Sequence, residues 1–211
     1  MLESWIAFKS GGIMMLPLSL LAILALAILL EKSWLYLTRV KLSSELGQLL
    51  ESYEFDMNEL NRLLQQDPSS NVFRQFFGTV AGNAERPVWW LESRAADEAQ
   101  MIEHRLSRRL WLLETTVTAA PLLGLMGTIA GMMHAFNLIG ANGLVNPSGL
   151  TGGVAQALIA TASGLLIALV SLFGFNFFAR LQAQTLDDME RLGTRLIDRI
   201  RLAKGERHET A

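Results

Sequence analysis

A few polar residues in an otherwise uncharged stretch are the best candidates for chemistry. Residues 115–179 contain no Asp, Glu, Lys or Arg, so few groups there could hold a proton. His134 lies inside the stretch, and Glu114 directly precedes it. Thr128 and Thr161 carry hydroxyls, which both donate and accept hydrogen bonds. His134 has two interpretations: a proton relay or, as we favour, a polar residue near the outer end of a helix.

The parts that other chemistries need are missing from the sequence. Among the three histidines, His104, His134 and His208, no pair has metal-ligand spacing. No Gly-rich phosphate loop follows a strand, and no nucleophile lies near a plausible base. There is no cysteine, and a net charge of −2 gives no electrostatic basis for binding nucleic acid. We therefore expect no enzyme activity, no metal, no cofactor and no nucleic-acid partner.

The uncharged stretch is long enough to cross a membrane twice. A bilayer core is roughly 30 Å thick and takes about 20 helical residues. Turn residues cluster at 140–149, which separates a helix over 114–139 from one over 150–179. An earlier uncharged run, 10–30, predicts a first transmembrane helix over 13–37, after an interfacial segment over 1–12. The expected fold is all-α with three transmembrane helices.

The distribution of Lys and Arg orients these helices. One lies before the first helix, ten lie between residues 31 and 114, none lies in 140–149, and seven follow residue 179. The positive-inside rule then places the N-terminus and the short loop outside, and residues 38–113 and 180–211 in the cytoplasm. Residues 38–113 have a mostly helical pattern, with breaks at 67–71 and before Pro87. Nothing stops the helix from Val88 to the membrane, so we expect long cytoplasmic extensions of the spans.

Small and apolar faces indicate where the helices pack. Lipid gives no hydrophobic reward for helix pairing, so close approach depends on small residues. A further apolar stripe after residue 179 needs a partner. These faces predict a ring-forming homo-oligomer. From spacing alone, a single threonine in such a helix more often just bonds back to its own helix. The small residues are Gly124, Gly127, Gly131, Ala157, Ala160, Gly164, Ala168 and Ser171; the stripe is Leu186, Met189, Leu192, Leu196, Ile197 and Ile200.

Two ordered motifs carry a resemblance to a known family. The first is Ala-Pro-Leu-Leu-Gly-Leu-Met-Gly-Thr-Ile-Ala-Gly-Met-Met-His-Ala-Phe at 120–136, and the second is Val-Ala-Gln-Ala-Leu-Ile-Ala-Thr-Ala-Ser-Gly-Leu at 154–165. Together they closely resemble the ExbB/TolQ/MotA family of proton-channel stator proteins, nearest to the ExbB/TolQ branch. Pro121 matches the proline of the family's Pro-Leu-Leu-Gly-Leu motif. The MotA branch is less similar because it has four crossings.

The resemblance implies a motor subunit. Family members form a pentamer around the membrane helices of a dimeric ExbD or TolR partner, whose single membrane aspartate takes up and releases protons. By resemblance, Thr128 and Thr161 line the proton path opposite that aspartate, and a TonB- or TolA-like protein and membrane lipids are further partners. Gln156 departs from the family's usual glutamate and cannot titrate, so a packing role is at least as well supported. Whether the ion is proton or sodium and which system is energised stay open; the alternative function is a passive membrane scaffold without ion flow.

Overall fold

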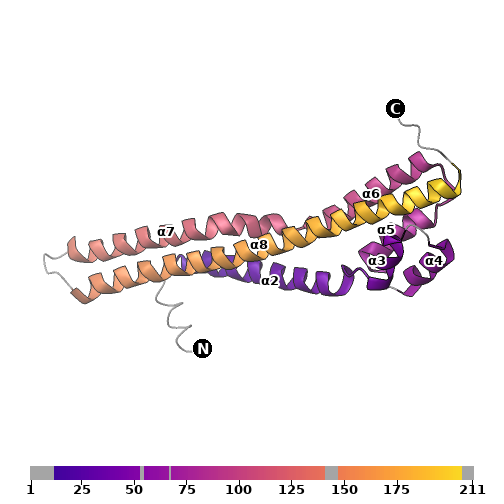
Figure 1. The fold of residues 1–211 in the computed structure, drawn as a ribbon. Helices are drawn as coiled ribbons and strands as arrows, with labels where there is room; N and C mark the ends of the chain where they lie inside the picture. The colour runs from indigo at the N-terminus through magenta and orange to yellow at the C-terminus, as the bar shows by residue number, and fades with distance from the viewer. Residues whose placement is uncertain (1–11, 53–54, 67, 141–146, 206–211) are drawn as a thin grey trace. The chain divides into compact units, whose positions relative to one another are not determined.

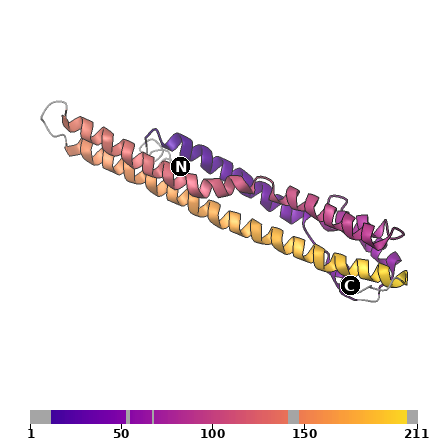
Figure 2. The same ribbon diagram turned by 90° about the horizontal axis from the view of Figure 1, so that it is seen from above.

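A computed structural model describes residues 12–52, 55–66, 68–140 and 147–205. The expectations for the N-terminal segment up to residue 11, for most of the loop at 140–149 and for the tail with His208 lie outside these residues. Every regular element that the structure describes is an α-helix (Figure 1, Figure 2). The helices are α2 Met15–Arg39, α3 Ser44–Glu51, α4 Met57–Gln66, α5 Val72–Ala81, α6 Val88–Ser107, α7 Leu110–Gly140 and α8 Pro147–Ala203.

Three helical stretches are long and apolar enough to cross a membrane. They are Met15–Arg39, Val88–Phe136, which includes the junction of α6 and α7, and Gly149–Ala203. The expectation of an all-helical membrane protein with three spans is confirmed at this level. Helix α8 has 57 residues, about 85 Å at 1.5 Å per residue, so it extends well beyond a bilayer core of roughly 30 Å.

The chain divides into two compact units. We call Met1–Leu30 with Arg109–Phe178 the apolar unit, and Glu31–Arg108 with Ala179–Ala211 the charged unit. In the apolar unit α2, α7 and α8 share a small core in which Leu18, Ala120 and Ala168 are buried. Helix α2 packs closely on α8, because a Cβ added at Gly174 would overlap Leu29.

The charged unit has a larger apolar core, built by α3, α4, α5, α6 and the last part of α8. Phe76 and Phe77 of α5 are buried and meet edge to face, with ring centroids 5.1 Å apart. The stripe of α8 lies in the same core, with Met189 and Leu192 fully buried. The sequence predicts that this stripe needs a partner, and the partner is in the same chain, because α3 to α6 pack against the stripe.

The expectation of an unbroken helix from Val88 into the membrane is wrong. Helix α6 ends at Ser107 and α7 begins at Leu110; between them Arg109 has φ 68°, a left-handed conformation that a non-glycine residue rarely adopts. In a continuous helix the Leu106 carbonyl would accept a hydrogen bond four residues later. Here it accepts one from Lys32 Nζ of α2 at 2.5 Å, which satisfies the carbonyl where the helix stops.

The other breaks of the charged unit have local causes. Asn71 caps α5, since its Oδ1 accepts from the Phe73 backbone N–H at 2.8 Å. Pro87 directly precedes the first residue of α6, where a missing N–H costs nothing. The helical spacing over 45–64 is divided into α3 and α4, and Asp56 accepts from the Asn58 N–H at the start of α4.

Candidate functional site: the threonine turn of the apolar unit

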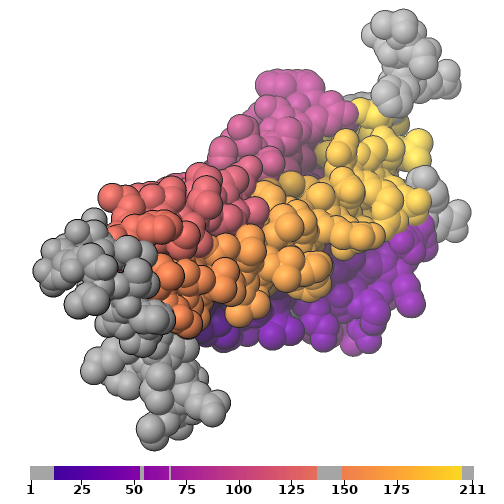
Figure 3. Space-filling view, turned by 90° about the vertical axis from the view of Figure 1, so that its left-hand side faces the viewer, coloured from indigo at the N-terminus to yellow at the C-terminus, as the bar shows by residue number. Residues whose placement is uncertain are grey.

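The small faces found in the sequence pair α7 with α8 inside one chain. A Cβ added at Gly127 would lie 2.5 Å from the Ala160 Cβ, and one at Gly131 would lie 3.0 Å from the Ala157 Cβ. A Cβ at Gly164 would lie 2.5 Å from the Ala120 carbonyl oxygen. Figure 3 shows side chains of α7 in salmon directly against those of α8 in orange. The small faces of α7 and α8 are therefore buried against each other in a single chain, without a second copy.

Thr161 uses its hydroxyl between the two helices. Its Oγ1 donates to the Gly124 carbonyl oxygen of α7 at 3.0 Å, and its side chain is half-buried. Gly124 can receive this contact because a Cβ there would lie 3.1 Å from the Thr161 Cα. The bond fixes the register of α8 on α7 at this turn.

Thr128 lies one helical turn after Gly124, on the same face of α7. Its Oγ1 donates to the Leu125 carbonyl oxygen of its own helix at 2.7 Å, and its side chain is half-buried. Of the alternatives left open for the threonines, Thr128 makes the local bond and Thr161 makes one across the interface. We call residues 124–128 together with Thr161 the threonine turn.

A cavity of about 300 Å³ with two polar side chains in a mainly apolar lining adjoins this region. His134 and Gln156 supply its polar side chains, while Gly127, Gly131 and the chain at Gly12 form part of its wall. The Gln156 amide lies against Gly12, where a Cβ would overlap it. A cavity of this size has room for several water molecules beside its two polar side chains. Of the polar residues that the sequence singled out, His134 and Gln156 thus lie along one cavity, and Glu114 does not line it.

The remaining candidates lie elsewhere in the apolar unit. Glu114 is exposed near the start of α7, 14 residues before Thr128 and therefore about 21 Å away along the helix. Pro121 is inside α7 and half-buried, one turn before Leu125. Ala168 is buried against Ala120 in the core of this unit.

Comparison with known proteins agrees with the motifs. The MotA/TolQ/ExbB proton channel family model matches residues 64–191. A Synechocystis protein whose name likens it to the biopolymer transport protein ExbB is 30% identical over 196 residues, which are 90% of this chain and 76% of that protein. The biopolymer transport protein ExbB of Aquifex aeolicus is 38% identical over 136 residues, 64% of this chain and 92% of that protein. The chain belongs to the MotA/TolQ/ExbB proton channel family.

The sequence analysis missed one glycine at which α7 and α8 pack closely, near the cavity lined by His134 and Gln156. A Cβ added at Gly153 would lie 2.6 Å from the Ala135 Cβ and 3.1 Å from the Gly131 carbonyl oxygen. Gly153 is one turn before Ala157, so extending the small-residue stripe of α8 backwards by four positions would have found it.

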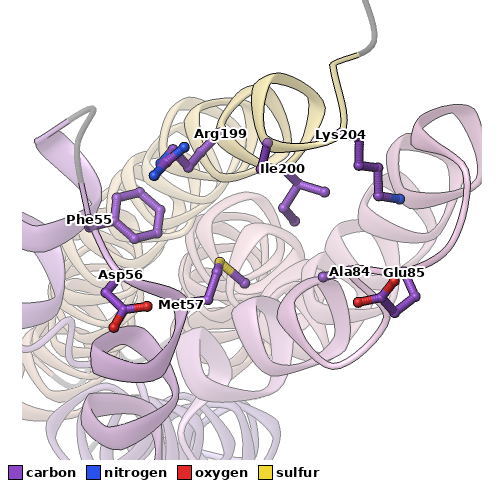
Figure 4. Close-up of a pocket in the computed structure, with 9 residues that line it drawn as sticks. Phe55, Asp56, Met57, Ala84, Glu85, Arg199, Ile200 and Lys204 are labelled. Atoms are coloured by element: carbon purple, nitrogen blue, oxygen red, sulfur yellow. The ribbon is translucent and has the colours of Figure 1, made fainter.

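Another cavity lies in the charged unit, far along the sequence from the threonine turn. It has about 600 Å³ and mixes an apolar lining, including Phe55 and Ile200, with charged groups of both signs (Figure 4). The Asn58 backbone N–H, which donates to Asp56 on its edge, holds the pKa of that carboxyl below its usual value. Among the described residues no group of His, Asp and Glu could hold a metal ion.

Proposed function

We propose that this chain is the proton-channel subunit of an inner-membrane motor, and that it couples proton flow to work by a partner protein. The observation that carries the proposal is the threonine turn. It sets two hydroxyl groups at one level of α7, in a stretch that contains no Asp, Glu, Lys or Arg. Membership of the proton channel family supports the same function.

The absence of a carboxylate beside the threonine turn determines what the partner must supply. His134 is the one titratable side chain in the sequence of residues 115–179, because this stretch also lacks Tyr and Cys. Because we place His134 near the outer end of α7, a proton at the level of the threonine turn is held by a group from another chain in this proposal. An ExbD- or TolR-like protein with one membrane helix and one aspartate supplies it. Hydroxyls at the threonine turn can hydrogen-bond either protonation state of that carboxyl group.

The cavity with His134 and Gln156 provides access from the periplasmic side in this proposal. Water in the cavity would reach the turn that contains Gly127, next to Thr128. Gln156 hydrogen-bonds water without titrating, so it holds the water and passes no charge of its own. One charge that crosses about 100 mV releases roughly 2.3 kcal/mol, so repeated transfers supply the motor.

The subunits form a closed ring, a pentamer by family resemblance, with α7 and α8 around the partner's helices. Since the small faces already pair α7 with α8, the contacts between subunits must come from larger side chains. Exposed apolar residues are available on all three helices of the apolar unit, for example Leu20, Met126 and Phe173. A stable monomer in a mild detergent, measured by mass, would exclude the ring.

The partner-dependence of proton flux tests the function. The chain is purified with an ExbD- or TolR-like protein that has a single membrane helix with an aspartate, and the complex is reconstituted in liposomes with an internal pH dye. At an imposed membrane potential we expect proton entry that needs both chains and disappears when the partner's aspartate is changed to asparagine. Equal, negligible flux from the intact and the asparagine complexes would favour the passive scaffold. Flux that depends on sodium rather than pH would change the coupling ion.

A further inference from the structure

A pocket of about 270 Å³ in the charged unit collects basic side chains from two distant parts of the chain. Lys32 and Arg39 come from the end of α2, and Arg105 and Arg108 come from the end of α6 and the residue that follows it. Glu31 is the carboxylate of the lining. The formal charge of these five side chains is therefore +3, in a pocket that has room for a phosphate group.

The four cations differ in how they are already used. Lys32 is buried, with 1% of its surface exposed, and its Nζ donates to the Leu106 carbonyl oxygen, so it forms part of the wall. Arg105 is held by Gln75 Oε1 at 2.8 Å, and its distance to Glu98 Oε1 is 3.6 Å. These contacts fix the floor of the pocket before any ligand enters.

Three cations of the pocket are exposed, and Gln75 and Glu98 hold Arg105, which leaves Arg39 and Arg108 for a ligand. Within the described part of the chain, neither forms an ion pair with a carboxylate. The Arg39 guanidinium stands over the Trp34 ring, 5.7 Å from its centre, which leaves its N–H groups able to bind an anion. A planar guanidinium binds a phosphate through two parallel hydrogen bonds.

The positions of these residues on their helices indicate how far the pocket lies from the membrane-spanning segments. The apolar run of α2 ends at Leu30, and Lys32 and Arg39 follow it by about 3 Å and 13 Å along the helix axis. Arg108 precedes the first residue of α7, the next apolar helix, by two positions. The headgroup layer of a bilayer is about 5 to 8 Å thick on each side. Side chains on a helix tilt towards its N-terminus, so those of Lys32 and Arg39 reach back along α2 towards this layer.

We propose that this pocket binds the phosphate of an anionic phospholipid headgroup. Lys32 and Arg105 form its fixed base, and Arg39 and Arg108 close on the phosphate oxygens. The half-buried Leu35 in the lining suits the glycerol and first acyl carbons of a lipid, whereas free phosphate would leave it uncovered. The site is independent of proton conduction, so loss of one activity does not imply loss of the other.

Native mass spectrometry of the full-length protein, stripped of lipid and titrated with defined lipids, tests the proposal. We expect phosphatidylglycerol or cardiolipin to bind at least tenfold more tightly than phosphatidylcholine. The double variant Arg39→Gln/Arg108→Gln should reduce this preference to within about twofold. The matched control Arg62→Gln/Arg94→Gln removes two exposed arginines of α4 and α6 outside the pocket and should keep the preference.

Three outcomes would overturn the lipid site. They are equal binding of anionic and zwitterionic lipids by the unmodified protein, an unchanged preference in the pocket variant, and an equal loss in the control variant. Inorganic phosphate at 10 mM should not displace the bound lipid, and displacement would identify a free-phosphate site instead. Circular dichroism checks that each variant keeps its helices. Should the double variant not fold, each single substitution is expected to lower the preference at least threefold.

Discussion

At the scale of single residues, the two threonines of the threonine turn make different hydrogen bonds in addition to their proposed place on the proton path. Thr128 bonds to its own helix, whereas Thr161 bonds to the Gly124 carbonyl of α7. Replacing the Thr161 hydroxyl with a methyl group therefore removes a contact between helices as well as a group on the proposed proton path. The Thr161 variants must be interpreted with this in mind.

Thr161→Val should weaken the pairing of α7 and α8, and Thr161→Ser should preserve it because serine keeps the hydroxyl. Hydrogen bonds between membrane helices contribute about 0.6 kcal/mol on average and up to about 1.7 kcal/mol. Thermal unfolding in detergent should therefore show a small loss of stability for the valine variant. Ser171→Ala is the control, since Ser171 is buried but donates to Ile167 of its own helix. A larger loss in that control than in Thr161→Val would contradict the role of the bond between helices.

At the scale of elements, the packing of α8 explains its length. Its first part pairs with α7 through small residues, and its last part supplies Met189 and Leu192 to the core of the charged unit. On its exposed side, Arg191 donates to Glu51 of α3 at 2.8 Å, which lowers the pKa of that carboxyl. This depressed pKa contributes stability above about pH 4.5 that is lost as the pH falls through it. An exposed pair of this kind contributes little, so the buried contacts hold the helix in place.

Gly164→Ala should destabilise the apolar unit. The added Cβ would meet the Ala120 carbonyl oxygen at 2.5 Å, and backbone of α7 must move to admit it. Overpacking of this kind costs about 1 to 3 kcal/mol, and Gly164→Leu should cost more. Gly152→Ala is the matched control. Gly152 is on the same helix, and a Cβ added there meets no atom of another element within 4 Å. Unfolding temperatures in detergent give the comparison; a stable Gly164→Ala variant would contradict the close approach of α7 and α8.

Local patterns predict the helices and their local breaks. Uncharged runs mark the spans, and Asn71 and Pro87 mark helix starts by their own chemistry. The break between α6 and α7 could not be predicted, because Arg109 carries no glycine or proline signal and the Leu106 carbonyl finds its partner on Lys32, 74 residues away. The same limit applies to the small faces. The small residues predict close helix packing, but only the structure shows that the small faces of α7 and α8 pack against each other.

At the scale of the whole molecule, the apolar unit and the charged unit have separate tasks in the proposed motor. The apolar unit carries the threonine turn and the cavity lined by His134 and Gln156. The charged unit carries the basic pocket and the larger core. Membership of the proton channel family connects these parts with ion flow, and the partner's aspartate completes the path in our proposal.

Proton flux through the Thr128→Val complex tests this account most directly. Thr128 donates only within its own helix, so its replacement leaves the bond between α7 and α8 in place. Loss of a hydrogen bond to a charged group costs roughly 1.5 to 3 kcal/mol, so we expect flux in liposomes to fall about ten- to hundredfold while ring and partner stay assembled. Thr118→Val is the matched control, because Thr118 is also on α7 and also donates to the carbonyl three residues earlier. Flux at the unmodified rate in an assembled Thr128→Val complex, or an equal fall in Thr118→Val, would contradict the account.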